Sequence, residues 1–195
     1  MTPDRTAAPD HAIDSHDDAR RDGGLTHVRA DGSAHMVDVS DKAVTRRQAT
    51  AEAVLLSRPE VVARILDGEL PKGDALAVAR VAGIMAAKRT PDLVPLCHPL
   101  PISGVTVDFT GVPGAEETPG RHAAPEPGDR AAGIRITATV RTTGVTGVEM
   151  EALTAASVAA LTLYDMIKAL DRAAEISAVR VVSKSGGASG EWTRP

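Results

Sequence analysis

Aromatic residues are scarce in this sequence of 195 residues, since Phe109, Tyr164 and Trp192 make up only 2% of it. The core must therefore consist of aliphatic side chains and alanine, and the hydrophobic fraction of 43% is large enough for one domain with a real core. The scarcity excludes an aromatic cage around a planar ligand. It also argues against nucleic-acid binding by stacking of bases on aromatic rings.

Cys97 is the single cysteine, so the chain can form no internal disulfide and no cysteine-ligated iron–sulfur cluster. An excess of basic residues is also missing, because the net charge is -4 at pH 7, which argues against a general nucleic-acid binder. We find no apolar run long enough to span a membrane, and the N-terminus is polar rather than a signal peptide. These absences predict a cytoplasmic protein whose partners include neither nucleic acid nor a membrane.

The composition changes along the chain. The polar residues 1–24 predict a disordered N-terminal tail, with His11 and His16 leaving a metal-binding tail as an alternative. Residues 25–192 then form a single domain. Within it, residues 111–133 are rich in proline, glycine and acidic side chains, which predicts a flexible loop between two strands.

Two periodicities place the secondary structure. Alternation of apolar and polar residues predicts strands, at residues 34–39, 49–56, 102–110, 134–142 and 179–182. The second of these segments also suits a helix, because alanine and glutamate favour one. Helical spacing and start signals predict three helices, at residues 60–66, 74–88 and 148–173. Strands and helices are interleaved around a central hairpin, so we expect an α+β sandwich whose antiparallel sheet has helices packed on one face.

The helix expected at 148–173 is apolar or small almost all the way round, which is typical of a buried helix. It nevertheless carries Glu149, Glu151, Asp165 and Lys168, and buried charges are costly unless they are paired or used. Glu149 can be explained as part of a capping box at the helix start, whereas Glu151 has no such role. Asp165 and Lys168 are three residues apart and form either a solvated ion pair or a functional pair.

Glu151 and Asp165 lie fourteen residues apart, which is roughly 21 Å along a helix. One compact site on one chain cannot comfortably use both side chains. Three arrangements stay open: two separate sites, a long ligand, or a neighbouring subunit that brings a second helix end close and places the site at an interface.

Further basic groups are spread along the chain. Lys72 precedes a helix start, where anions bind, although Gly73 or Asp74 can be an ordinary N-cap beside a solvated lysine. Lys184 lies just before two glycines, which suits a phosphate contact. The segment lacks the upstream glycine and the following helix of a P-loop, so that motif is rejected.

Cys97 and His98 lie side by side in a proline-bounded turn. No second ligand cluster provides a zinc spacing. One interpretation is a histidine that acts as acid, base or phosphate ligand, and the other is a buried cysteine beside a structural histidine. Together with the positive charge of Arg46 and Arg47, these groups suit a phosphorylated ligand and proton transfers without a metal cage.

Seven motifs occur in order along the chain, namely His35-Met36-Val37-Asp38-Val39-Ser40, Lys72-Gly73-Asp74, Ala87-Lys88-Arg89-Thr90, Pro95-Leu96-Cys97-His98-Pro99-Leu100, Gly147-Val148-Glu149-Met150-Glu151-Ala152-Leu153, Tyr164-Asp165-Met166 with Lys168, and Lys184-Ser185-Gly186-Gly187. On these motifs the chain resembles the MoaC family, the cyclic pyranopterin monophosphate synthases of molybdenum cofactor biosynthesis. The resemblance covers residues 25–192. The expected loop at 111–133 is longer than the tight hairpin usual in the family, and the tail exceeds the family core.

The resemblance implies a ferredoxin-like α+β fold and a homohexamer, built as a trimer of dimers with its sites at subunit interfaces. It also implies a phosphorus–oxygen lyase. The implied substrate is (8S)-3',8-cyclo-7,8-dihydroguanosine 5'-triphosphate, the product of a radical SAM enzyme, and the implied products are cyclic pyranopterin monophosphate and pyrophosphate. The upstream radical SAM enzyme is then a candidate partner. No cofactor or metal site is evident, although magnesium could accompany the triphosphate substrate.

By the same resemblance, Asp165 is the general acid and base, and Lys72 and Lys168 are catalytic lysines. Lys184 would hold phosphate, with support from Asp38 and Glu149. The other substrate-binding residues would be Leu96, Cys97, His98, Met150 and Glu151. Two other functions stay open: a non-catalytic module that binds a nucleotide as a regulator, and a Schiff-base lyase that uses Lys168.

Overall fold

The computed structural model describes residues 31–113 and 132–195. The expected tail at 1–24 and most of the expected loop at 111–133 lie outside these residues. The chain divides into two units, Met1–Val37 and Asp38–Pro195. In the described part of the first unit, the Ser33 amide donates a hydrogen bond of 2.9 Å to the Asp31 carboxylate. The sheet and the helices belong to the second unit.

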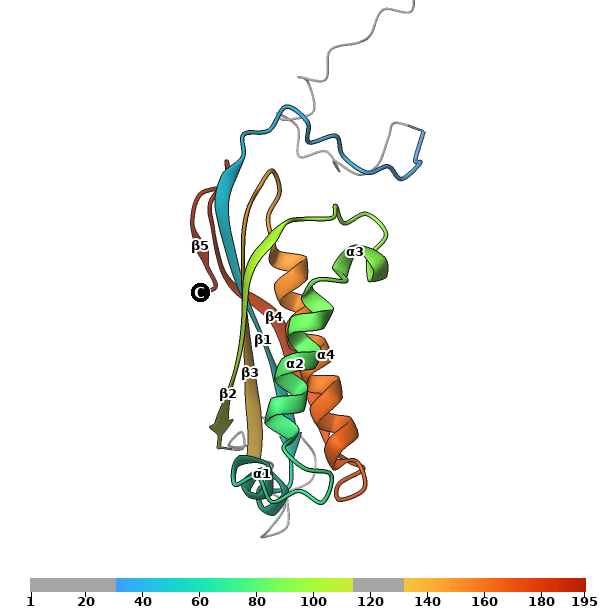
Figure 1. Cartoon of the computed structure of the whole chain (residues 1–195), viewed down its shortest axis with the longest axis vertical. Coiled ribbons are helices and arrows are strands. Elements are labelled where there is room, and N and C mark those ends of the chain that lie inside the picture. The colour runs from blue at the N-terminus through green and yellow to red at the C-terminus, as the bar shows by residue number, and fades with distance from the viewer. Residues whose placement is uncertain (1–30, 114–131) are drawn as a thin grey trace, which may run out of the picture. The chain divides into compact units, whose positions relative to one another are not determined.

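Five strands form one sheet (Figure 1), namely β1 (Thr45–Ser57), β2 (Ile102–Val112), β3 (Ala132–Gly144), β4 (Glu175–Ser185) and β5 (Trp192–Thr193). Their order across the sheet is β2-β3-β1-β4-β5, and every neighbouring pair is antiparallel. The strands predicted at 49–56, 102–110, 134–142 and 179–182 are therefore confirmed, and each is longer than its alternating pattern indicates.

The helices lie between strands in the sequence. Three of them connect β1 to β2, namely α1 (Pro59–Leu66), α2 (Ala75–Ala87) and α3 (Thr90–Leu93). The fourth, α4 (Glu149–Ile167), connects β3 to β4. The long helices α2 and α4 lie side by side on one face of the sheet (Figure 1). The predicted α+β architecture, an antiparallel sheet with helices on one face, is confirmed.

Alternation along the strands separates the two faces of the sheet. On the helix side, Ala51, Ala53 and Leu55 of β1 are fully buried. On the opposite face, the hydroxyls of Thr50 and Thr139 share a hydrogen bond of 2.9 Å. The buried side of α4 consists largely of alanine, at Ala152, Ala155, Ala156, Ala159 and Ala160. This aliphatic core is the one that the scarcity of aromatic residues requires.

Gly83 lets the two long helices approach closely. A Cβ atom at this position would lie 2.9 Å from the carbonyl oxygen of Ala155, 3.2 Å from Val107 and 3.3 Å from Ala159. Real Cβ atoms do not approach a backbone oxygen that closely, so the spacing of α2 and α4 requires a residue without a side chain here. The spacing in turn fixes where the ends of the two helices lie relative to each other.

Residues 34–39 do not form the expected strand, and an isolated bridge at Ala34 is the one strand-like pairing among them. Exposure does alternate along this segment. A strand also needs a continuous ladder of backbone hydrogen bonds, however, and within the described part of the chain these residues have only this one bridged position. The short elements α3 and β5 are absent from the prediction because four and two residues carry no periodic signal.

The helix predicted to end at residue 173 ends at Ile167. The reason is Asp171, whose carboxylate accepts hydrogen bonds from the Ser57 hydroxyl at 2.7 Å and from the Arg58 amide at 3.2 Å. Burial alone would raise the pKa of Asp171, but these hydrogen bonds outweigh it and lower the pKa. The contact turns the chain away from the helix axis and back to the end of β1.

By length and composition, α4 could cross a membrane, which differs from the expectation that no apolar run is long enough. The helix packs against the sheet and against α2, and eight of its residues are buried there. A core helix meets the same criteria of length and composition, so this property does not indicate a membrane protein.

Candidate active site

Three side chains meet where α4 ends and α2 begins, and we call Lys72, Asp165 and Lys168 the lysine–aspartate cluster. The Lys168 ammonium lies 2.6 Å from Asp165 Oδ1. Lys72 donates a hydrogen bond of 2.7 Å to the backbone carbonyl of Asp165, and its Nζ lies 3.4 Å from Asp165 Oδ2. All three side chains are roughly half exposed. The three residues that the resemblance implies to be catalytic are thus brought together.

The turn before α2 positions Lys72. The Gly73 amide donates to the Leu70 carbonyl at 3.0 Å, and Gly73 has a φ of +93°, a conformation that glycine adopts without strain. Asp74 is the N-cap of α2 and accepts from the Ala77 amide at 2.9 Å. The N-cap interpretation is therefore confirmed for Asp74. The solvated-lysine interpretation is wrong for Lys72, because its ammonium binds the last turn of α4.

Opposite charges fix the protonation of this cluster. The hydrogen bond from Lys168 is the largest cause that holds the pKa of the Asp165 carboxyl below its usual value, and the nearby charges act in the same direction. The hydrogen bond to Asp165 raises the pKa of Lys168. Near neutral pH the cluster therefore contains a carboxylate and two ammonium groups. Its positive surplus and its exposure suit the binding of an anion.

A second group lies around the start of α4, and we call Cys97, Glu149, Glu151 and Lys184 the glutamate cluster. The Lys184 ammonium, at the end of β4, lies 3.0 Å from Glu149 Oε1. The predicted capping box is wrong: Val148 is the N-cap, no side chain caps the helix there, and Glu149 is the first helical residue. Its carboxylate bends back over Gly147 towards Lys184 instead.

Glu151 is 3% exposed, which is unusual for a glutamate. Burial raises the pKa of its carboxyl, and the like charge of Glu149 adds to this rise. Burial also raises the pKa of the Cys97 thiol, and the charge of Glu151 contributes to it. The glutamate cluster therefore contains groups that hold protons more tightly than usual, in contrast to the ionised Asp165.

The remaining predicted residues lie near these groups in sequence. Leu96 and Met150 are exposed apolar side chains that flank Cys97 and Glu151. His98 is half-buried. The Asp38 carboxylate accepts hydrogen bonds from the amide and the hydroxyl of Ser40, at 2.9 and 2.6 Å.

The two clusters lie at opposite ends of α4 (Figure 1). Glu149 and Asp165 are separated by sixteen residues, or about 24 Å of helix. A single chain therefore does not combine the clusters into one compact site, in agreement with the distance expected from the sequence.

Arg47 is a neighbour of the glutamate cluster. The sequence predicts only that it adds positive charge, with no specific contact. Its Nε donates to the Gly144 carbonyl at 3.0 Å, and its guanidinium fills the space that a Cβ at Gly187 would need. Gly186 is equally close to the backbone of Arg46, and both glycines have positive φ. The glycine pair is the feature of the sequence that could have predicted this contact, because residues without a side chain let Arg46 and Arg47 approach the backbone closely.

Acidic and histidine side chains do not gather into a metal cage in the described part of the chain, where no group of three or more His, Cys, Asp or Glu residues could hold an ion. The positive charges within the two clusters, which could meet a phosphorylated ligand, are those of lysines. This fold and these two clusters define an α+β protein whose ionisable groups suit acid–base chemistry on an anionic ligand.

Comparison with known proteins identifies the family. The model of the MoaC family matches residues 36–187, which include both clusters, and the chain belongs to this family. It is 57% identical over 169 residues to the cyclic pyranopterin monophosphate synthase of Corynebacterium efficiens, covering 87% of this chain and 97% of that protein. It is 55% identical over 171 residues to the synthase of Chloroflexus aurantiacus, covering 88% and 95%. It is 57% identical over 174 residues to cyclic pyranopterin monophosphate synthase 2 of Mycobacterium bovis, covering 89% and 93%.

Proposed function

We propose that the chain converts (8S)-3',8-cyclo-7,8-dihydroguanosine 5'-triphosphate to cyclic pyranopterin monophosphate, with release of pyrophosphate, in molybdenum cofactor biosynthesis. The observation that carries this proposal is the identity of 55–57% to named synthases over nearly their whole length. The family match includes every residue of both clusters. The geometry of the clusters then suggests how the work is divided between them.

The reaction opens the guanine ring, closes a pterin ring and joins a ribose hydroxyl to the α-phosphate. Each of these steps moves protons, and the departing pyrophosphate needs cationic stabilisation. Asp165 is ionised in the free protein and Lys168 is protonated, so the first serves as base and the second as acid. Lys72, hydrogen-bonded to the same aspartate, adds the charge that an anionic transition state needs.

The glutamate cluster supplies the substrate pocket in this proposal. Glu151 and Cys97 hold protons unusually well and can hydrogen-bond polar edges of the base, beside His98. Leu96 and Met150 offer apolar contacts. Lys184 holds phosphate, with Glu149 and Asp38 in supporting positions. Magnesium accompanies the triphosphate rather than a protein metal site.

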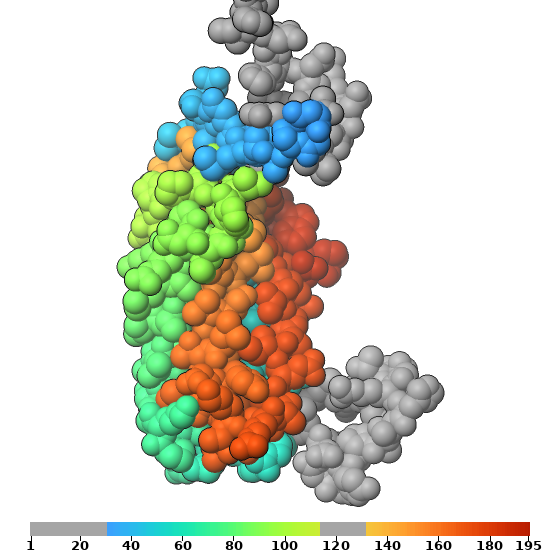
Figure 2. All heavy atoms as spheres, turned by 90° about the vertical axis from the view of Figure 1, so that its right-hand side faces the viewer, coloured from blue at the N-terminus to red at the C-terminus, as the bar shows by residue number. Residues whose placement is uncertain are grey.

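A complete site needs both clusters, and we infer that two subunits provide them. The outer side of the helical layer offers a surface for this contact, since Val78, Val81 and Met85 of α2 and Leu161 of α4 are exposed. Figure 2 shows α2 and α4 side by side on this surface. A second copy packed there about a two-fold axis, with its α4 antiparallel, brings the lysine–aspartate cluster of one chain to the glutamate cluster of the other.

Three such dimers would form the homohexamer implied by the family. The element order β1, helices, β2, β3, α4, β4 and the strand order β4-β1-β3-β2 support a ferredoxin-like fold with β5 added at one edge. We further propose that the enzyme works in the cytoplasm and receives its substrate from the upstream radical SAM enzyme.

The test is release of pyrophosphate from the authentic cyclised GTP. We expect turnover by the natural chain and a loss of about a hundredfold or more in Lys72→Ala and in Lys168→Ala, with the oligomer unchanged. Arg172→Gln is a matched control, because it removes one exposed positive charge near the same helix end. The Tyr164 hydroxyl donates a hydrogen bond to the backbone carbonyl of Arg172, which the substitution keeps.

Two results would favour the competing functions. Tight binding of the substrate by the natural chain without any pyrophosphate release would identify a regulatory nucleotide-binding module. A borohydride-stable adduct on Lys168 would identify a Schiff-base lyase, whereas the proposed reaction leaves no adduct there.

A further inference from the structure

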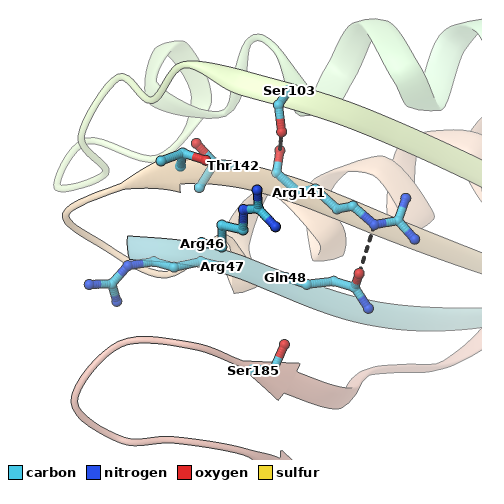
Figure 3. A pocket seen from close by; sticks show the side chains of 8 residues that line it. Arg46, Arg47, Gln48, Ser103, Arg141, Thr142 and Ser185 are labelled. Carbon is cyan, nitrogen blue, oxygen red and sulfur yellow. Dashed lines mark hydrogen bonds between the residues drawn. The ribbon is translucent and has the colours of Figure 1, made fainter. Parts of the chain in front are cut away.

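A pocket of about 390 Å³ lies at the end of the sheet where β1 begins and β3 and β4 end. Figure 3 shows it on the side of the strands that faces away from the helices. The residues that line it include Arg46, Gln48, Ser103, Arg141, Thr143 and Ser185. Neither catalytic cluster contributes one of these residues.

The strand register explains why these residues meet. Gln48 of β1 lies opposite Arg141 of β3 and opposite Ser185 of β4, and Arg46 lies opposite Thr143. Residues that pair directly project from the same face of a sheet, and diagonal neighbours remain within reach of long side chains. Arg46 and Arg141 are such diagonal neighbours, so their two positive charges lie on one face.

Gly104 keeps this face open on the β2 side. It lies opposite Arg141, and a Cβ atom at this position would meet nothing within 4 Å. Lys184, in contrast, belongs to the other face, because it precedes Ser185 in the strand and reaches Glu149 on the helix side. Lys184 and the pocket therefore lie on opposite faces of the sheet, although Arg47, the neighbour of the glutamate cluster, also lines the pocket.

The positive charge in the pocket is not balanced by the side chains that line it, because none of them is acidic. Arg141 donates from Nε to the neutral Gln48 Oε1 at 2.7 Å (Figure 3), which orients the guanidinium without neutralising it. No hydrogen bond or ion pair of the Arg46 guanidinium involves a residue in 31–113 or 132–195. Two like charges on neighbouring positions of a sheet repel each other.

Further along the same face of the sheet, the positive charges of two other arginines are balanced by a carboxylate. Arg180 donates from Nε to Glu52 Oε1 at 2.8 Å, and Arg135 Nε lies 3.8 Å from Glu52 Oε2. Glu52 is buried beneath these two arginines. Among residues 31–113 and 132–195, no such carboxylate accompanies the arginines of the pocket, and they are available to an external anion.

We propose that this pocket binds a polyphosphate group, either free pyrophosphate or the phosphate chain of a nucleotide. Guanidinium groups bind phosphate through paired N–H donors, and two of them spaced along a pocket fit a chain of phosphates better than a single one. The hydroxyls of Thr143 and Ser185 add neutral donors. The lining offers no aromatic ring for a base, so recognition rests on the phosphates.

The proposal is tested by calorimetric titration of the full chain with inorganic pyrophosphate. The triple variant Lys72→Ala/Lys168→Ala/Lys184→Ala is used as background, so that pyrophosphate binding at the three lysines of the proposed active site does not mask the pocket. We expect this background to bind pyrophosphate, and the additional change Arg46→Gln/Arg141→Gln to weaken binding by about tenfold or more, because charge-assisted hydrogen bonds are lost. Arg135→Gln, on the same face but outside the pocket, leaves the affinity unchanged.

Titration with GTP and with guanosine separates the two sources of the ligand. Binding of pyrophosphate and GTP but not guanosine supports recognition of the phosphate chain, and weaker binding of GTP than of pyrophosphate indicates the free anion. Unchanged pyrophosphate affinity after loss of both arginines, or binding of guanosine alone, overturns the proposal.

A second variant covers the case in which the double arginine variant does not fold. Gly104→Asp places a carboxylate beside Arg141 in open space, and we expect it to weaken pyrophosphate binding while thermal unfolding stays cooperative. Turnover of cyclised GTP is measured in parallel. Failure of turnover in the natural chain would reject the proposed function, and the titration in the catalytically inactive background would still decide on the pocket.

Discussion

Lys72 binds Asp165 through the backbone as well as through the side chain, with its ammonium 2.7 Å from the carbonyl oxygen and 3.4 Å from Oδ2. The carbonyl belongs to the last turn of α4, where the final carbonyls of a helix lack partners within the helix. Lys72 therefore satisfies a helix end and completes a charged cluster at the same time. The link joins residues 93 positions apart and sets the position of α2 against α4 at this end.

Lys168 should react differently with amine reagents once its partner is removed. The hydrogen bond to Asp165 raises its pKa, so the natural side chain stays protonated to a higher pH and acylates slowly. Asp165→Asn removes this cause, and we expect faster acylation of Lys168 at mildly alkaline pH. The measurement is mass spectrometry of partially acetylated protein, with Lys42 as an internal reference on an exposed site. Equal rates in both proteins would show that the pair does not control the protonation of Lys168.

Sharing of the site between two chains should allow two inactive variants to rescue each other. Lys72→Ala damages the lysine–aspartate cluster, and Lys184→Ala damages the glutamate cluster. In a mixed dimer one of the two sites combines the undamaged clusters, so random mixing of equal amounts should restore about a quarter of the natural activity. The measurement is pyrophosphate release after the two variants are unfolded and refolded together.

A matched mixture provides the control for this rescue. Lys72→Ala mixed with Lys168→Ala damages the same cluster twice, so no intact site can form and activity should stay at the level of the single variants. Rescue in this second mixture, or no rescue in the first, would contradict a site built from opposite ends of two α4 helices.

The local pattern predicts part of this site and misses the rest for physical reasons. The pairing of Asp165 with Lys168 follows from their helical spacing, and the separation of Glu151 from Asp165 follows from helix geometry. The contact of Lys72 with Asp165 depends on how α2 packs on α4, which no local pattern contains. Glu149 has the spacing of a capping residue, yet its carboxylate pairs with Lys184, because β4 ends beside the helix start.

In the fold as well, local patterns predict some features, and others depend on contacts between distant residues. Alternating residues locate four strands and the sides of the sheet that they bury, since period-two burial is a local property. Residues 34–39 have the same alternation, but among the described residues they pair with another segment only through the bridge at Ala34. The end of α4 depends on a long-range contact of Asp171 with Ser57, so helical pattern alone extends the helix too far.

Glu151 should make stability depend on pH. Burial raises the pKa of its carboxyl above the usual 4.5, so the folded chain keeps the proton that the unfolded chain has already released. The folded state is therefore favoured below pH 4.5, and this contribution is lost as the pH rises through the raised pKa of the folded state. Glu151→Gln removes the titrating group. We expect its free energy of unfolding, measured with urea at several pH values, to lack the decline that the natural chain shows in this range.

Activity separates this effect from a purely structural one. If Glu151 contacts the substrate, Glu151→Gln lowers turnover by about tenfold or more even at a pH where its stability equals or exceeds that of the natural chain. A variant that loses stability at every pH and keeps its activity would assign Glu151 to the core instead.

Gly83 and Gly104 should respond in opposite directions to the same substitution. A methyl group at Gly83 would lie 2.9 Å from the Ala155 carbonyl oxygen and would push α2 away from α4. Gly83→Ala gains up to about 1 kcal/mol of helix propensity but costs about 1–3 kcal/mol through overpacking against a backbone that cannot move freely, so we expect a net loss of stability. Gly104→Ala meets nothing within 4 Å and should be neutral or slightly stabilising. Thermal unfolding of both variants measures the difference, and turnover shows whether the shift of α2 also displaces Lys72 from Asp165. A Gly83→Ala variant as stable and as active as Gly104→Ala would mean that the close approach of the two helices is not needed to hold that pair in place.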